Sequence, residues 1–293
     1  MVISVSRRCD IPRFRFDWFL ERLDAGFVEV ANPYNTAQVR RVSLQPGDVD
    51  ALAFWTRDPR PILAHAAELE TRGYRYYLMV SLTGYPALLE PNCPGAGAVI
   101  RAMGELAAKI GPERLIWRYD PVLLTTVTGP DFHRRNFRQL AEALEGAVRR
   151  VIISVYDEYR GSQKRLEALE AHSGTGFRAL AHYEDEPEEA GPAKDGGRLL
   201  PEVWTLLEDL ADIAGEAGLE TRSCAEAPPG DGPEPGRIIP GACIDGELLH
   251  RLWGLDLPGR DQYQRPRCGC VPSVDIGSYG PCPAACVYCY AWR

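Results

Sequence analysis

Short runs of apolar and β-branched residues recur along the chain and are separated by polar or glycine-rich sequence. They cover residues 2–6, 27–32, 51–56, 76–83, 114–119, 150–156, 219–224 and 273–277. Runs of four to eight apolar residues that are bounded by turn residues are typical of strands buried on both faces. The pattern therefore predicts eight strands.

Between most of these strands, apolar residues recur with a helical period. The predicted helices cover residues 17–25, 61–71, 98–110, 131–144, 161–171 and 201–217. Strands that alternate with helices are typical of parallel βαβ units, and eight strands favour a closed (β/α)8 barrel of the TIM type. Only QVRRVSLQPGDVD joins the second strand to the third, which is too short for a full crossover helix.

The domain organisation follows from length and composition. The chain has 293 residues, of which 45% are hydrophobic, so it can build one large core. We expect one integrated domain, in which residues 1–223 form the bulk of the barrel. Residues 224–293 form a cysteine-rich cap that includes the barrel-closing strand. Residues 184–197 and 227–236 are rich in Pro, Gly and acid and predict loops.

Charge and hydropathy narrow the function classes. The 33 basic and 41 acidic side chains give a formal charge of -8, which leaves nucleic-acid binding unsupported. No apolar run is long enough to span a bilayer, and charges stand where a signal peptide needs its apolar stretch. We therefore expect a cytoplasmic protein without membrane contact. Thiols stay reduced there, so nine cysteines indicate metal ligation or catalysis before disulfides.

Polar residues follow almost every predicted strand, where a parallel barrel carries its reactive groups. The candidate catalytic residues are Tyr119, Asp120, Tyr156, Asp157 and Cys224. The candidate binding residues are Arg7, Arg8, Asp10, Asn32, Asn35, Arg57, Arg118 and Ser154. Arginines there can present paired donors to a carboxylate or phosphate, and aspartates can bind a ribose or an amine. A ring of ion pairs at the barrel mouth is the structural alternative, and it is compatible with binding.

The last residues contain a C-x3-C-x2-C pattern at Cys282, Cys286 and Cys289. Three thiolates at this spacing can hold three irons of a cubane cluster and leave the fourth iron open, whereas structural zinc sites use four ligands. With Tyr288 before the third cysteine, the pattern resembles the radical-SAM motif. That resemblance implies a [4Fe-4S] cluster, S-adenosylmethionine on the open iron, its reductive cleavage, oxygen sensitivity and a reductant such as flavodoxin or ferredoxin. It also places Tyr288 near the adenine.

The motif follows the last strand, whereas the radical-SAM superfamily carries it after the first. In a closed barrel the last strand lies beside the first, so a circular permutation restores the same arrangement. The segment SRRCD then stands where that superfamily holds the methionine amine. The resemblance thus makes Arg7, Arg8 and Asp10 candidate contacts of S-adenosylmethionine.

Four further cysteines stand at Cys224, Cys243, Cys268 and Cys270. Four thiolates suffice for a second, fully ligated [4Fe-4S] cluster or for an all-thiolate zinc site. The C-x-C step disfavours zinc without excluding it, and Cys224 can instead face the barrel mouth. Cys9 and Cys93 have no cysteine neighbour at a useful spacing and are expected to be buried or incidental thiols.

The chain also resembles a family almost end to end, namely the domain-of-unknown-function family DUF1848. The resemblance rests on VISVSRRCDIP, ANPYN, FWTRDP, IWRYDP, CGCVPSVDIGSYG and CPAACVYCYA. That family usually reads SRRTDIP at its start, so Cys9 replaces a threonine. The resemblance implies iron-sulfur chemistry and supplies no substrate.

Three functions remain open. The first is a radical-SAM-type enzyme that acts on a small molecule or peptide in the barrel mouth. The second is an electron-transfer or redox-sensing iron-sulfur protein, and the third is a zinc-stabilised binding protein. The polar strand ends favour the enzyme, because an electron carrier needs no ring of arginines and aspartates.

Overall fold

The computed structural model describes residues 1–33, 35–183, 198–226, 237–265 and 267–292. Both predicted loops, 184–197 and 227–236, lie outside these residues. The described strands of the main sheet are β1 (Val2–Val5), β4 (Ala51–Thr56), β5 (Tyr76–Ser81), β6 (Leu115–Val122), β7 (Arg150–Val155), β8 (Glu220–Ser223), β9 (Ile239–Pro240) and β10 (Ser273–Asp275). The described helices are α1 (Ile11–Phe14), α2 (Phe16–Ala25), α3 (Arg60–Thr71), α4 (Ala96–Ile110), α5 (Pro130–Ala143), α6 (Arg160–Ser173), α7 (Pro201–Glu216), α8 (Gly246–Trp253) and the short 3-10 helix Pro112–Arg114.

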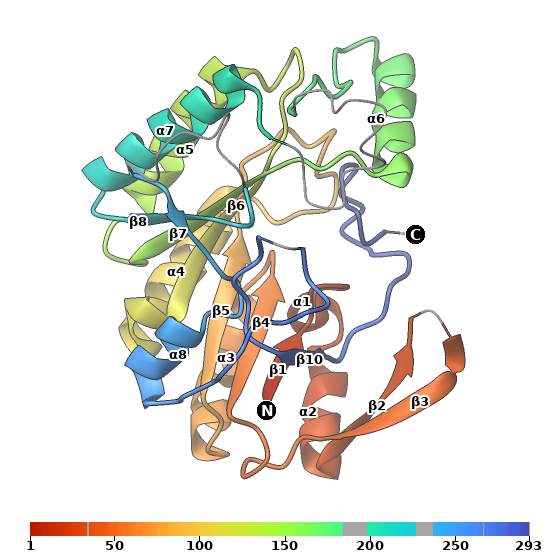
Figure 1. Ribbon diagram of the computed structural model, residues 1–293, viewed down its shortest axis with the longest axis vertical. Helices are drawn as coiled ribbons and strands as arrows, with labels where there is room; N and C mark the ends of the chain where they lie inside the picture. The colour runs from red at the N-terminus through yellow and green to blue at the C-terminus, as the bar shows by residue number, and fades with distance from the viewer. Residues whose placement is uncertain (34, 184–197, 227–236, 266, 293) are drawn as a thin grey trace.

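These strands form one parallel sheet in the order β10-β1-β4-β5-β6-β7-β8-β9 (Figure 1). Seven of its members are predicted strands, and all six predicted helices are present, so the α/β prediction is confirmed. The last predicted strand does lie beside the first, since Val2 pairs with Ser273 and Ser4 with Asp275. In the described residues β10 and β9 are not paired with each other, so closure of the barrel stays a prediction.

Alternating residues of the strands bury two different cores. One face carries large side chains such as Phe54, Leu78 and Trp117, which pack against α2, α3, α4, α5 and α7. The other face has small side chains at Ala51 and Ala53, and buried residues between Ala242 and Leu249 and between Cys268 and Val271 pack on it. This period of two follows from the pleat of a strand. The small side chains leave room for a cysteine-bearing segment on the face that has few helices.

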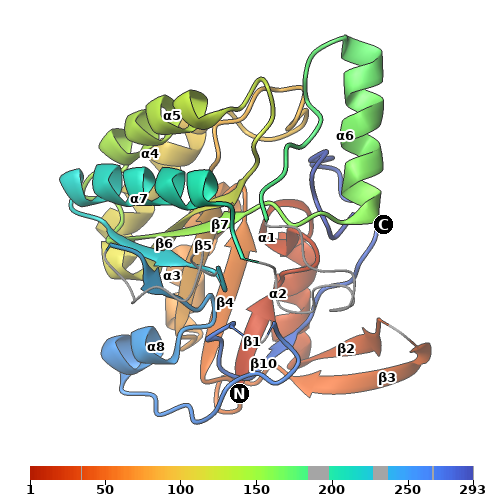
Figure 2. The same ribbon diagram turned by 45° about the horizontal axis from the view of Figure 1, so that its top comes forward.

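The second predicted strand does not belong to the main sheet, and this part of the barrel prediction is wrong. Strand β2 (Phe27–Asn32) pairs antiparallel with β3 (Asn35–Ser43), and the hairpin projects from the body in both ribbon views (Figures 1 and 2). The physical reason is the short connection to β4, which cannot hold the crossover that a parallel strand needs.

Besides β3 and the 3-10 helix, three described elements were not predicted. At the start of helix α1, the Asp10 side chain accepts a hydrogen bond from the Arg13 amide. At the start of α8, the Asp245 side chain accepts hydrogen bonds from the amides of Glu247 and Leu248. Strand β9 has only two residues, which is too short for a periodic signal. No helix in the described part of the chain is long and apolar enough to cross a membrane.

Two buried histidines make the fold sensitive to acid. His133 donates from Nε2 to the Leu123 carbonyl at 3.1 Å and accepts from the Tyr119 hydroxyl at 2.8 Å, and His182 accepts from the Leu124 amide at 2.9 Å. Burial lowers the pKa of each imidazole to about 4. The unfolded chain binds these protons at higher pH, near the ordinary value of about 6.5.

We therefore expect the free energy of unfolding to fall as pH drops from about 6.5 to about 4, by about 1–3 kcal/mol for each histidine. Replacing His133→Asn should make this dependence shallower, whereas the exposed His172→Asn should leave it unchanged. Urea unfolding across this pH range measures both slopes. Identical slopes for the two variants would contradict the assignment.

Candidate metal centre

The Asp275 carboxylate joins the two ends of the chain. It accepts hydrogen bonds from the Ser4 hydroxyl at 2.8 Å, the Ser6 hydroxyl at 2.5 Å and the Arg7 amide at 2.8 Å. It also accepts from the Gly277 amide at 2.9 Å. A Cβ at Gly277 would stand 2.0 Å from the Ser6 hydroxyl, so only glycine allows this approach. The segment after β10 is therefore fixed against the end of β1.

Cys282, Cys286 and Cys289 follow on this segment, and we call them the C-terminal thiol set. They lie in one apolar cluster with Tyr85 and Tyr156 among its buried members. Burial raises the pKa of the Cys282 and Cys289 thiols. Contact with Cys93, whose Sγ lies 3.5 Å away, lowers the pKa of the Cys286 thiol to about 7. The structure thus brings the three predicted thiols together in a largely apolar setting.

Tyr288 is held by two charged side chains. Arg57 donates to the Tyr288 hydroxyl and, at 2.8 Å, to Glu90, and the Tyr288 hydroxyl in turn donates to Glu90. The Thr83 hydroxyl donates to the same carboxylate. Arg57 and Tyr288, both predicted site residues, therefore meet, and Glu90 completes the contact. Glu90 was missed because it follows no predicted strand directly.

Arg165, on α6, holds the backbone of the same segment. Its guanidinium donates to the carbonyls of Val287 at 2.9 Å, Cys289, and Trp292 at 3.2 Å, and stands over the Trp292 ring. One side chain thereby satisfies three carbonyls of an irregular loop that has no sheet partner of its own. Sequence reasoning gave no signal for Arg165, because its helix position looks like an ordinary solvated face.

The predicted contacts of S-adenosylmethionine lie next to this segment, and their side chains already have partners. Asp10 accepts from the Thr56 hydroxyl and the Arg57 amide, both at 2.8 Å, and its burial raises the pKa of its carboxyl to about 6. Arg8 donates to the Gly277 carbonyl at 3.3 Å. Arg7 donates to the Ser273 hydroxyl at 2.8 Å. These side chains brace the joined chain ends.

Cys224, Cys243, Cys268 and Cys270 form a second group, which we call the inner thiol set. The Sγ atoms of Cys224 and Cys243 lie 3.7 Å apart, and Cys270 accepts from the Ile244 amide at 3.3 Å. Contact with Cys243 lowers the pKa of the Cys224 thiol to about 6, and contact with Cys243 and Cys268 lowers that of Cys270. All four predicted thiols therefore meet on the face of the sheet that carries Ala51 and Ala53.

Positive charge surrounds the inner thiol set. Arg265 donates to the Cys224 carbonyl at 2.7 Å, and its guanidinium also lies 3.9 Å from the Cys224 sulfur. Arg118 and Arg7 stand over the Trp55 ring at 4.7 Å and 5.8 Å from its centroid. The guanidinium of Arg118 helps to lower the pKa of the Cys224 thiol. This surrounding charge favours the thiolate form.

Two buried donors beside this group have no acceptor. The indole Nε1 of Trp55 and the Nε of Arg118 lack a hydrogen-bond partner among the described residues. Trp55 belongs to the apolar cluster that contains Cys243, Cys268 and Cys270. Ordered water or a bound group can satisfy such donors.

The strand ends above this group form ion pairs. Arg118 is paired with Asp120, which also accepts from the Ser154 hydroxyl. Asp157 accepts from Arg265 at 3.0 Å and from the Tyr183 hydroxyl at 2.9 Å. The predicted residues Arg118, Asp120, Ser154 and Asp157 thus lie near the carboxyl ends of β6 and β7 and form ion pairs and hydrogen bonds there, which agrees with the structural alternative.

Four predicted site residues lie elsewhere. Asn32 and Asn35 stand at the tip of the β2–β3 hairpin, so their placement at the barrel mouth is wrong, because their strand is not in the main sheet. Tyr119 is fully buried against the outer helices, where it also accepts from Asn136 at 3.0 Å. The Tyr156 hydroxyl contacts that of Ser162 at 2.7 Å inside the apolar cluster.

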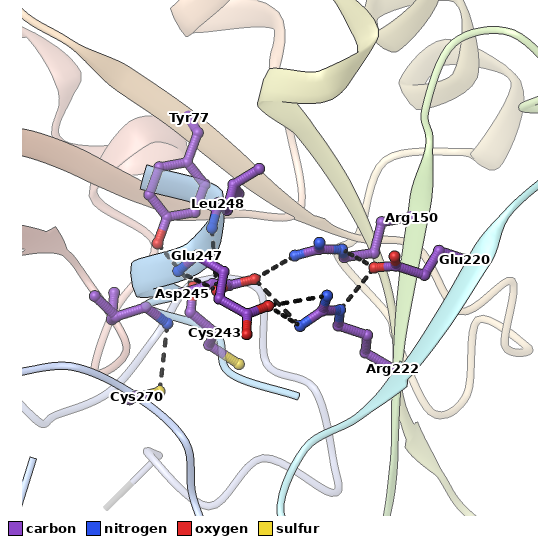
Figure 3. Close-up of polar contacts among 10 residues, drawn as sticks. Tyr77, Arg150, Glu220, Arg222, Cys243, Asp245, Glu247, Leu248 and Cys270 are labelled. Atoms are coloured by element: carbon purple, nitrogen blue, oxygen red, sulfur yellow. Dashed lines mark hydrogen bonds and ion pairs between the residues drawn. The ribbon is translucent and has the colours of Figure 1, made fainter. Parts of the chain in front are cut away.

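An ion-pair network fixes the segment that carries Cys243 (Figure 3). Asp245 caps α8 and lies 2.5 Å from the Arg150 guanidinium and 3.6 Å from that of Arg222. The Tyr77 hydroxyl donates to the Cys243 carbonyl at 2.7 Å. The inner thiol set is therefore anchored to β5, β7 and β8. In the described chain, however, no three Cys, His, Asp or Glu side chains are arranged to hold a metal ion as they stand.

Comparison with known proteins shows which family this chain belongs to. The family described as "Domain of unknown function (DUF1848)" matches residues 2–291. The chain belongs to the DUF1848 family. No curated protein matches this DUF1848 chain.

Among solved structures, one similar chain is the HpcH/HpaI aldolase from Desulfitobacterium hafniense DCB-2. It has 10% identity and a TM-score of 0.26, and the match covers 76% of each chain. A TM-score this low supports no conclusion about the activity of the DUF1848 chain.

The anchor at Asp245 gives a stability prediction. Asp245→Ala would remove one of the two carboxylates paired with buried Arg150, leaving Glu220, and would remove the cap of α8, so we expect a loss of about 2–4 kcal/mol in unfolding free energy. Glu247→Ala is the matched control, because that side chain is 77% exposed and should cost about 0.5 kcal/mol or less. Denaturant unfolding measures both. Equal losses would show that the network does not anchor this segment.

The three carbonyl contacts of Arg165 give a second prediction. Arg165→Ala should free residues 287–292, so limited proteolysis should cleave the C-terminal segment faster than in the unsubstituted chain. Lys164→Ala, at an exposed position one residue earlier, is the control and should leave cleavage unchanged. The role of Arg165 is refuted if the two variants are cleaved at the same rate.

Proposed function

We propose that this DUF1848 protein is a radical-SAM-type enzyme whose [4Fe-4S] cluster is bound by Cys282, Cys286 and Cys289. The observation that carries the proposal is the placement of the three thiols on one loop directly after β10, which pairs with β1. The loop thus leaves the carboxyl end of the sheet, where parallel α/β proteins bind their ligands. With S-adenosylmethionine, the cluster would supply a 5′-deoxyadenosyl radical to a small molecule or peptide substrate.

The chain's own residues would prepare this site in three ways. The apolar cluster around Cys286 limits the access of water, which would protect reactive intermediates. Arg57 and Glu90 fix the hydroxyl of Tyr288 and so orient its ring. Arg165 holds the loop carbonyls, so that the thiols need not order the backbone alone.

The inner thiol set fits a second metal group by its donors. It offers four thiols, and Arg7, Arg118 and Arg265 offset the negative charge that four thiolates would bring. The unpaired N–H groups of Trp55 and Arg118 favour a cluster over zinc, because a cluster adds sulfide acceptors to its thiolates. We infer a second, fully ligated cluster here, which would relay electrons from a reductant such as flavodoxin or ferredoxin.

Metal analysis of anaerobically reconstituted protein tests the proposal. Removal of the C-terminal thiol set, by Cys282→Ala with Cys286→Ala and Cys289→Ala, should lower the iron content by about half if each set holds one cluster. It should also abolish the spectral change caused by S-adenosylmethionine. Removal of the inner thiol set, by Cys243→Ala with Cys270→Ala, should lower iron equally and keep that spectral change. Cys9→Ala is the control and should change neither.

Other outcomes identify the alternatives. Suppose that both sets hold iron, that S-adenosylmethionine causes no spectral change, and that no cleavage product forms under strong reduction. The protein would then be an electron-transfer or redox-sensing protein. Zinc without iron after anaerobic purification would leave a zinc-stabilised binding protein. Unchanged iron in the C-terminal variant would refute the assignment of that set.

A further inference from the structure

Cys93 lies against the C-terminal thiol set, although nothing in its sequence neighbourhood predicts this. Its Sγ is 3.5 Å from the Sγ of Cys286, which comes 193 positions later. Cys93 is only partly buried, and it packs against the same apolar cluster that contains the three C-terminal thiols. The site therefore has a fourth thiol, contributed by the loop between β5 and α4.

Several hydrogen bonds connect the loop of Cys93 to the C-terminal segment at defined positions. The Val287 amide donates to the Leu89 carbonyl at 3.0 Å, and the Asn92 side chain donates to the Pro283 carbonyl at 2.9 Å. The Tyr288 hydroxyl donates to Glu90. These contacts come just before Cys93 in one loop and on both sides of Cys286 in the other, so the packing of the two loops brings Cys93 to Cys286.

Cys93 also lines a cavity of about 240 Å³. Arg57, Thr83, Glu90 and Tyr85 line it as well, together with the start of α4. Cys93 thus lines this cavity and also contacts Cys286, which is not among the lining residues. A group that displaced the Cys93 thiol from the thiol set would occupy, or be reached from, this cavity.

We propose that Cys93 is the fourth thiolate ligand of the C-terminal cluster and that S-adenosylmethionine displaces it. This inference rests on the proposed function. Clusters are commonly held by three closely spaced cysteines and a fourth from a distant part of the chain. In the exchange, Cys93 would leave the fourth iron as the amine and carboxylate of S-adenosylmethionine bind there, and the proton that the ammonium group of S-adenosylmethionine gives up on binding would pass to the Cys93 thiolate. No oxidation or reduction is involved.

The positive charge of Arg57 suits this role. Its guanidinium is paired with Glu90 at 2.8 Å and stands over the Tyr288 ring, 5.7 Å from the centroid. A cation at this position stabilises thiolates that ligate the same cluster. It stays in place when Cys93 leaves, because Glu90 and Tyr288 hold it.

Thiol alkylation followed by mass spectrometry tests the proposal on the full chain. In reconstituted protein we expect Cys93 to be alkylated at least about tenfold more slowly than in the metal-free protein, because a ligated sulfur is not a free nucleophile. Adding S-adenosylmethionine should restore the faster rate at Cys93 and leave Cys282, Cys286 and Cys289 protected. Cys9, which belongs to neither thiol set, is the internal control.

Two variants check the same point without alkylation. Cys93→Ala and Cys93→Ser should keep the three other ligands but lose one iron more readily on mild oxidation than the unsubstituted protein or Cys9→Ala. Equal alkylation of Cys93 with and without metal, or equal iron loss in all four proteins, would overturn the role of Cys93. Failure of the proposed function gives another result: the variant that lacks Cys282, Cys286 and Cys289 would then contain as much iron as the unsubstituted protein.

Discussion

The hydrogen bonds of the Asp275 carboxylate are the constraint on which the rest of this structure depends. They connect the first strand of the chain to the last, so a cysteine loop at the C-terminal end lies beside Arg7 and Asp10 at the N-terminal end. Parallel pairing at such a sequence separation has a large entropic cost, because the intervening chain must be ordered first. A buried carboxylate with four donors offsets part of that cost. It also fixes where the thiols lie relative to the sheet.

The two faces of the sheet explain why there are two thiol sets. The face with large side chains is covered by helices and carries no cysteine ligands, whereas the face with Ala51 and Ala53 admits the segment with Cys243 and Cys270. Arg118, which is paired with Asp120 at the end of β6, also acts on the Cys224 thiol. The ion pairs at the strand ends and the inner thiol set are therefore electrostatically connected. The C-terminal thiol set sits beyond the strand ends, in largely apolar surroundings.

The sequence predicted the regular part of the fold and the composition of both thiol sets. Helices and buried strands have a local period, so their positions followed from the pattern of apolar residues. Residues 27–32 also have strand periodicity, but periodicity does not say which strand is the partner, so Asn32 and Asn35 were misplaced. Glu90, Arg165 and Cys93 could not be predicted, because each acts through a contact with residues more than a hundred positions away. Only the packing of two loops against each other brings them to the site.

The most direct test of the central claim is the anomalous diffraction at the iron edge of anaerobic crystals grown with S-adenosylmethionine. The account predicts two iron peaks. One lies between Cys282, Cys286 and Cys289 with S-adenosylmethionine bound to it, and the other lies among Cys224, Cys243, Cys268 and Cys270. A single zinc peak, or no metal at the C-terminal thiols, would contradict it.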